Sequence, residues 1–149
     1  MPYPVIYSLW NNTQKAIPHS DAFERDNLLE ENIRTYISRS KTIMNGIEAK
    51  IQSLLAKSPE VIIWGTGQLV MKLLAETSLA KANIAAFVDG NPINHGKVIK
   101  GIPISSPKQI IGMIQPIIVT SILHQKAISD FIRNEMKLSN EIICLYPYC

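Results

Sequence analysis

One long helical pattern of apolar positions dominates the N-terminal part of the chain. The apolar residues recur alternately at intervals of four and three, with Ser40 at the one position that is not apolar. This spacing is typical of a heptad seam along one face of a helix. No proline interrupts the pattern, and Gly46 is its one weak point. We therefore predict a helix from about Ala22 to Lys57, with a seam made of Ile33, Ile37, Ser40, Met44, Ile47, Ile51 and Leu54.

The predicted helix is too long to lie entirely on a small domain. About 35 helical residues span about 50 Å, whereas the radius of gyration of such a domain is about 13–14 Å. We expect the C-terminal half to pack on the core and the N-terminal half to project or to contact a partner. An ordinary amphipathic helix on the sheet domain is the simpler explanation for the second half alone.

The remainder of the chain alternates short apolar runs with helical patterns, as α/β proteins do. The strands are nearly all apolar, which is typical of a parallel sheet covered on both faces. We predict an α/β, Rossmann-like parallel sheet of order 3-2-1-4-5, preceded by the long helix. The five predicted strands are Val61–Trp64, Ile84–Val88, Ile102–Ile104, Ile117–Thr120 and Ile142–Tyr146.

Two helices and one helix start are expected between these strands. The first helix runs from about Gly67 to Ser78, and the last from about Leu123 to Leu138. Ser106, Pro107 and Gln109 have the spacing of a capping box with proline at the first helical position. Residues 89–101 are expected to form a loop. The side chains predicted to face inward are Leu69, Val70, Leu73 and Leu74 in the first helix, and Ile128, Phe131 and Ile132 in the last.

This pattern divides the chain into an N-terminal arm (1–20), the long helix (21–58) and a nucleotide-binding domain (59–149). A chain of 149 residues suits one domain with an appendage. The arm contains an apolar stretch, Tyr3–Trp10, that could be an edge strand or lie on a partner. Asp21 and Glu24 have the spacing of a capping box at the start of the long helix.

The segment with the clearest chemical meaning follows the first predicted strand. Gly65 would let the chain turn tightly off the strand, and Gly67 would let the backbone approach a phosphate at the helix N-terminus. Asp89 follows Gly67 by 22 residues, at the end of the second strand, where an acid can reach a ribose hydroxyl. Strand, glycine turn, helix and acid together outline a mononucleotide-binding unit.

The glycine motif lacks its third member, because Val70 stands where that glycine would be. The third glycine normally allows close packing of helix on strand. We therefore expect Val70 to push the helix outward or to tilt it. A scaffold in which Gly65 and Gly67 serve only the turn is the alternative interpretation.

Ligands of parallel α/β sheets bind beyond the carboxyl ends of the strands, near the point where the strand order reverses. In this chain that edge should bring together three loops. Thr66 and Gln68 could donate to a phosphate, and Asp89 could accept from a sugar hydroxyl. The predicted binding residues are Gly65, Thr66, Gly67, Gln68, Asp89, Asn91 and Thr120.

Other polar residues near this edge have simpler explanations. Ser121 could also contact a ligand but is better explained as a helix N-cap, and Asn91 could serve turn formation alone. Loop residues are usually solvated, which is the default for His95, Lys97 and Lys100. His124 is expected to be structural or exposed.

Composition narrows the classes of function. The net charge is +3 with scattered basic residues, which argues against nucleic acid as a partner. No apolar run approaches the length of about 20 residues that spans a membrane. The two cysteines, Cys144 and Cys149, are too few for a disulfide framework, and we expect a reduced, cytoplasmic setting. No metal-ligand spacing and no nucleophile–base set occurs. We therefore predict no catalytic residue and no metal site.

From Asn32 to Tyr146 the chain resembles the C-terminal domain of bacterial sugar C-methyltransferases, which act on nucleotide-linked sugars. Similar runs occur in the N-terminal domains of sugar acyltransferases and of some nucleotide-sugar dehydratases. The resemblance is carried, after the long helix, by Trp64-Gly65-Thr66-Gly67, Phe87-Val88-Asp89-Gly90-Asn91-Pro92, His95-Gly96-Lys97 and Gly101-Ile102-Pro103-Ile104.

The resemblance implies a nucleotide-sugar setting for the glycine turn and Asp89. In those enzymes S-adenosylmethionine binds a separate preceding domain, and this chain has neither a second glycine motif nor the upstream zinc-ligand cysteines. It would therefore not be catalytic alone, and that cofactor would come only with a partner domain. The long helix would join it to a second copy or to a methyltransferase domain. The alternatives are an interaction module with a vestigial glycine turn and a small NAD-binding oxidoreductase domain.

Overall fold

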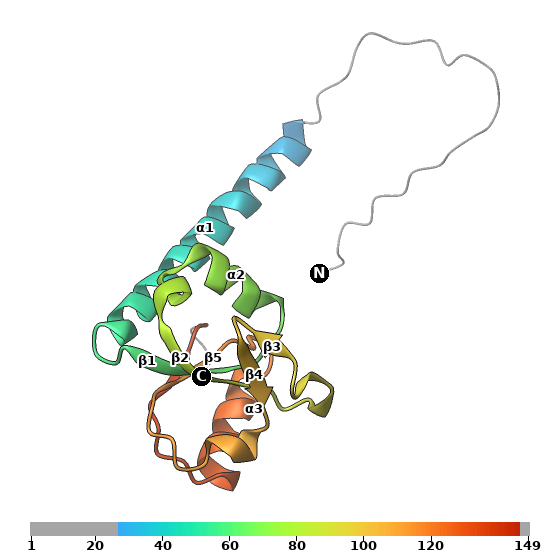
Figure 1. Cartoon of the computed structure of the whole chain (residues 1–149). Helices are drawn as coiled ribbons and strands as arrows, with labels where there is room; N and C mark the ends of the chain where they lie inside the picture. The colour runs from blue at the N-terminus through green and yellow to red at the C-terminus, as the bar shows by residue number, and fades with distance from the viewer. Residues whose placement is uncertain (1–26, 147–149) are drawn as a thin grey trace, which may run out of the picture.

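The computed structural model describes residues 27–146, which form one six-stranded sheet with helices on both faces (Figure 1). The strands are β1 Glu60–Trp64, β2 Asn83–Val88, β3 Val98–Ile99, β4 Ile102–Ser105, β5 Ile117–Val119 and β6 Ile142–Cys144. The α-helices are α1 Asn27–Leu55, α2 Gln68–Glu76 and α3 Gln125–Asp130. Short helical segments occupy η1 Ser78–Lys81, η2 Pro92–Asn94, η3 Pro107–Ile110 and η4 Phe131–Glu135, of which η4 is a π-helix.

The order of strands in the sheet is β3-β4-β2-β1-β5-β6. Along the run β4-β2-β1-β5-β6 each strand is parallel to its neighbour, and β3 pairs with β4 in the antiparallel direction. The predicted order 3-2-1-4-5 corresponds to β4-β2-β1-β5-β6 and is confirmed. The sheet has one strand more than predicted, because residues 98–99 of the expected loop turn back to pair with β4.

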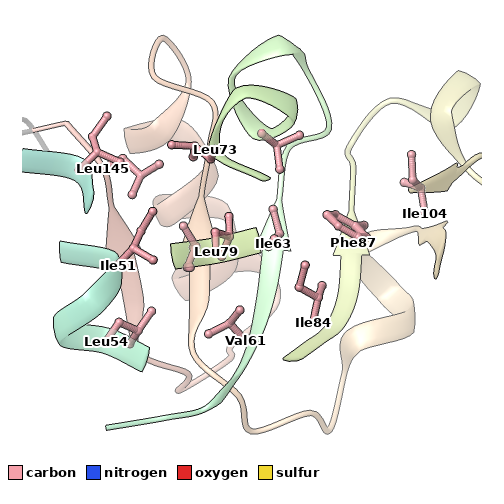
Figure 2. Close-up of a cluster of buried hydrophobic side chains, with 13 residues drawn as sticks. Ile51, Leu54, Val61, Ile63, Leu73, Leu79, Ile84, Phe87, Ile104 and Leu145 are labelled. Carbon is pink, nitrogen blue, oxygen red and sulfur yellow. The ribbon is translucent and has the colours of Figure 1, made fainter. Parts of the chain in front are cut away.

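The two faces of the sheet are buried in separate apolar clusters. In β1 the side chains of Val61 and Ile63 belong to one cluster, and those of Ile62 and Trp64 belong to the other. Successive strand residues point to opposite faces, and here both faces are covered by helices. This double coverage explains why the strands are nearly all apolar. Figure 2 shows the first cluster, which α1, α2 and η1 share with the sheet.

The two halves of α1 have different surroundings, as expected. Ile51 in the C-terminal half is fully buried against the sheet domain, whereas Ile33 and Ile37 are 49% and 46% exposed. The N-terminal half projects from the domain (Figure 1). The predicted start of the helix and residues 1–20, with the possible edge strand Tyr3–Trp10, lie outside the described residues.

Polar contacts attach α1 to the domain at two places. The Glu48 carboxylate accepts hydrogen bonds from the backbone N–H of Ser78, at 2.9 Å, and from the Ser78 hydroxyl. The Lys50 ammonium donates to the carbonyl oxygens of Cys144 and Leu145, at 3.1 and 3.3 Å. The C-terminal half of α1 is therefore fastened to η1 and to the end of β6, as well as buried.

The predicted inward face of the first helix is confirmed. Val70 and Leu73 of α2 are fully buried, and Leu69 and Leu74 pack partly buried against the same cluster. Val70 thus fills the space between helix and sheet where a Rossmann motif would have its third glycine.

The prediction for the last helix was partly wrong. The helix begins at Gln125, becomes π-helical at Phe131 and ends at Glu135. Phe131 is 40% exposed, whereas Ile132 is fully buried. The π-helical turn is wider than an α-helical turn and shifts the side chains around the axis. Phe131 consequently lies at the margin, where its ring meets that of Trp64 edge-on with centroids 6.2 Å apart.

The expected N-cap at Ser121 was also wrong. A turn over residues 122–124 separates Ser121 from α3, and His124 precedes the helix without a side-chain cap. The capping pair at Ser106 is present, since its backbone N–H donates to Gln109 Oε1 at 2.7 Å. Cys144 is disulfide-bonded, contrary to the expectation of reduced thiols.

Candidate functional site

A cleft of about 520 Å³ opens at the carboxyl ends of β1 and β5. The strand order reverses between these two strands, because β2 lies on one side of β1 and β5 on the other. Open α/β sheets bind ligands at such a switch point. The cleft is lined by Trp64, Gly65, Thr66, Gly67, Gln68, Leu69, Asp89, Gly90, Thr120, Ser121, Ile122, Leu123, His124 and Ile128.

Gly65 is required by the protein itself. Its φ of +103° lies in the region that favours glycine, and a Cβ there would stand 2.8 Å from Thr120 Oγ1. The Thr120 hydroxyl lies 3.0 Å from the carbonyl oxygen of Trp64 and 2.7 Å from that of Gly65, so it donates to the turn. The close approach of Gly65 and Thr120 joins the loops after β1 and β5.

Gly67 differs from Gly65 in both respects. Its φ of −78° and ψ of −169° are accessible to any residue. Apart from Gly67 itself and its two chain neighbours, no heavy atom of residues 27–146 lies within 4 Å of the position that a Cβ at Gly67 would occupy. Gly90, across the cleft, also has open space at that position. Neither turn geometry nor packing therefore explains Gly67, and bare backbone faces the cleft there.

Asp89 fastens the end of β2 to the glycine turn. Its Oδ2 accepts from the Thr66 hydroxyl, from the Thr66 backbone N–H at 3.2 Å and from Asn94 Nδ2 at 3.1 Å. Its Oδ1 accepts from the backbone N–H of Asn91 at 2.8 Å. The carboxylate oxygens expected to meet a ribose hydroxyl are thus largely occupied by donors of the protein.

These donors also act on the ionisation of Asp89. Partial burial works to raise the pKa of its carboxyl group, but the hydrogen bonds from Thr66, Asn91 and Asn94 outweigh burial and leave the pKa lowered. The cleft therefore contains a carboxylate that is ionised at neutral pH.

Six of the seven predicted binding residues line the cleft, and Asn91 does not. The Asn91 side chain instead accepts from the backbone N–H of Ile93 at 3.1 Å, which is the turn role considered for it. The loop residues behind it make local contacts. His95 Nε2 lies 2.8 Å from the Asp89 carbonyl oxygen, Lys97 donates to Asn94, and Lys100 donates to the Ala80 carbonyl.

One wall of the cleft was not predicted from the sequence. Ile122, Leu123 and His124 all line it, and Leu123 is 91% exposed at the rim. Leu123 was expected to begin the last helix and His124 to be structural or exposed, and no role was predicted for Ile122. Their position directly after the strand on the far side of the switch point was the available signal, because that loop always borders the cleft.

Three polar side chains of the cleft are not committed to the protein. Gln68, Ser121 and His124 make no side-chain hydrogen bond to any residue between 27 and 146 in the structure. Thr66, Asp89 and Thr120, by contrast, hold the loops together. The cleft therefore has an inner framework and a separate set of polar groups available to a ligand.

Between residues 27 and 146, no group of three or more His, Cys, Asp or Glu side chains is placed to hold a metal ion. Within the same range, none of the helices combines the length and the hydropathy needed to cross a membrane.

The fold and the cleft define a Rossmann-like α/β domain with an open switch point. The family model "C2185-like, N-terminal" matches residues 57–143, which is more than half of the chain. The chain therefore belongs to the C2185-like family, and the match covers the sheet domain and begins after the end of α1. None of the curated proteins compared with the chain matches it.

Two solved structures show a distant likeness. One is UDP-D-quinovosamine 4-dehydrogenase from Vibrio fischeri, 20% identical over 58% of this chain and 77% of that chain, with a TM-score of 0.43. The other is RSP in complex with beta-NADH, 20% identical over 62% of this chain and 47% of that chain, with a TM-score of 0.46. At these identities and TM-scores, the likenesses do not identify a ligand for this chain.

Proposed function

We propose that this chain is a nucleotide- or nucleotide-sugar-binding module whose ligand occupies the cleft at the switch point. The observation that carries the proposal is Gly67. It stands at the cleft with ordinary backbone angles and open space where a side chain would be. A glycine that the protein does not need for its own turn is explained by a ligand that approaches the backbone closely.

The proposed roles of the predicted site residues are of two kinds. Gly67 and Gln68 would face the phosphates, because the first N–H groups of α2 have no side-chain cap and favour an anion. The framework residues Gly65, Thr66, Asp89 and Thr120 would keep the two loops at the spacing the ligand needs. Asn91 would act indirectly, by holding Asp89 through its backbone N–H.

A nucleotide sugar is the ligand that the sequence resemblance favours. Two of the four runs that carry the resemblance to sugar C-methyltransferases, Trp64–Gly67 and Phe87–Pro92, contribute residues to the lining of the cleft. The chain has one glycine turn of this kind, so S-adenosylmethionine would require a partner domain. We propose that the module serves such a domain and performs no chemistry alone.

Isothermal titration calorimetry with UDP, dTDP and NAD tests the proposal. Binding of UDP or dTDP with a dissociation constant below about 1 mM is expected, a free energy of about −4 kcal/mol or better. Binding of NAD alone would instead favour the dinucleotide-binding oxidoreductase domain. Binding of none of the three would favour an interaction module in which the glycine turn is vestigial.

A second proposed role belongs to the projecting half of α1. Ile33, Tyr36 and Ile37 are 49%, 73% and 46% exposed in the structure. A continuous apolar stripe on a projecting helix is typical of a protein–protein contact. We propose that this stripe pairs with the same stripe of a second copy, with a methyltransferase domain as the alternative partner.

A further inference from the structure

The charge of the cleft restricts which nucleotides it suits. Asp89 is the one acidic residue among the lining residues, and neither lysine nor arginine is among them. Lys97 and Lys100, the two lysines of the loop that follows Asp89, donate to Asn94 and to the Ala80 carbonyl and do not line the cleft. Among residues 27–146, a ligand in the cleft therefore meets one fixed negative charge and no permanent side-chain cation.

The position of that charge is also defined. The Asp89 carboxylate accepts from the backbone N–H of Thr66, the residue directly before Gly67. A phosphate lying against Gly67 would consequently be a near neighbour of the carboxylate. Like charges at short range in a partly enclosed site repel each other more strongly than they do in water.

Nucleotides differ in the charge they would bring to this place. In a nucleotide sugar or a dinucleotide, the internal diphosphate is esterified at both of its ends. Each of its two phosphates therefore carries one negative charge. In UDP or UTP the terminal phosphate carries up to two. The repulsion by Asp89 therefore increases with every terminal phosphate charge.

The uncommitted polar side chains suit the less charged ligand. Gln68 and Ser121 are neutral hydrogen-bonding groups, and His124 lines the same cleft. Neutral donors and acceptors satisfy diester oxygens and sugar hydroxyls without a formal charge. The exposed apolar side chains of the lining, Ile122 and Leu123, offer contact area to a base or a sugar ring.

We propose that the cleft selects diphosphate diesters, such as nucleotide sugars, over nucleotides that end in a phosphate, and that Gln68, Ser121 and His124 supply its side-chain contacts to the ligand. This inference rests on the proposed function. It assigns the discrimination between nucleotides to Asp89, and the side-chain contacts that add affinity to three residues other than the motif glycines.

The test compares ligands that share a base. Calorimetry is performed with UDP-glucose, the β-methyl ester of UDP, UDP and UTP, and again with dTDP-glucose and dTDP. The methyl ester removes the terminal charge without adding a sugar. It should bind at least about threefold more tightly than UDP, and UTP more weakly than UDP, with both differences shrinking at high salt. Equal or tighter binding of UTP would overturn the charge selection.

Substitutions test the three ligand contacts. The affinity for UDP-glucose should fall about three- to tenfold in each of the variants Gln68→Ala, Ser121→Ala and His124→Ala. The melting temperature should not change, because these side chains make no hydrogen bond within residues 27–146. Ser139→Ala, which does not line the cleft, is the matched control. Unchanged affinity in all three variants would refute their role, whereas absence of binding by every nucleotide to the parent protein would refute the proposed function itself.

Discussion

Thr66 donates both its backbone N–H and its hydroxyl to the same carboxylate oxygen of Asp89. The two residues are 23 positions apart in sequence and stand at the carboxyl ends of the adjacent parallel strands β1 and β2. This pair makes Asp89 a structural part of the glycine turn. It changes the expected role of Asp89 from direct contact with a ribose to positioning of the cleft.

Asp89→Asn should destabilise the fold at neutral pH by about 1–2 kcal/mol, because hydrogen bonds to a partly exposed charged acceptor are lost or weakened. The folded pKa of Asp89 is lowered, so its carboxylate stabilises the protein above the unfolded pKa of about 3.9. That contribution disappears as the pH falls through the folded pKa. Urea unfolding of the parent and the variant at pH 7 and at about pH 3 measures how much of this contribution is lost on acidification.

The difference between the parent and the variant is the informative quantity. Burial works to raise the pKa of Glu48, but hydrogen bonds from Ser78 and Gln52 outweigh it and lower the pKa, so Glu48 also contributes to acid sensitivity. The contribution of Glu48 to acid sensitivity is the same in both proteins and cancels in the difference between their stabilities. A stability difference that persists undiminished at about pH 3 would contradict the assigned role of the Asp89 carboxylate.

Valine at the two glycines of the turn should have opposite consequences. Gly67→Val should change the free energy of unfolding by less than about 1 kcal/mol, because the backbone angles are ordinary and the space is open. Its affinity for a nucleotide should fall at least about tenfold. Gly65→Val should destabilise the fold by at least about 2 kcal/mol, because φ is +103° and the Cβ would strike Thr120.

Thermal unfolding and calorimetry on both variants separate the two glycines. If Gly67→Val lost stability as Gly65→Val does, Gly67 would serve the turn alone. If it kept both stability and affinity, the ligand would not approach the backbone at Gly67.

Ile33→Asp combined with Ile37→Asp should convert a dimer into a folded monomer. Both side chains are about half exposed on the projecting part of α1. Burying such a side chain contributes about 1.5–3 kcal/mol before the costs of association. Light scattering gives the mass, and circular dichroism reports whether the fold is kept.

Ile51→Asp is the matched control on the same seam. Ile51 is fully buried in the core, so an unpaired charge there should unfold the domain rather than dissociate it. A parent protein that is monomeric at high concentration would end the homodimer proposal.

The sheet could be predicted because its signals are local. Apolar strands, alternating helices and the glycine turn after Trp64 indicate a parallel α/β sheet and its switch point from the sequence alone. β3 was missed because a two-residue strand, Val98–Ile99, has no pattern of its own and depends on pairing with β4. Phe131 was misplaced because α-helical spacing does not reveal a π-helical turn.

The site divides in the same way. The sequence by itself determined which loops reach the cleft and which turn contains Gly65 and Gly67, because both follow from strand order and from the conformational freedom of glycine. Only the tertiary structure decided what those residues do there. A carboxylate accepts hydrogen bonds from whichever donors lie within reach. In the folded chain, Thr66 already donates to Asp89. Free space has no sequence signature, so the empty position at Gly67 and the uncommitted groups of Ser121 and His124 become visible only once the chain is folded.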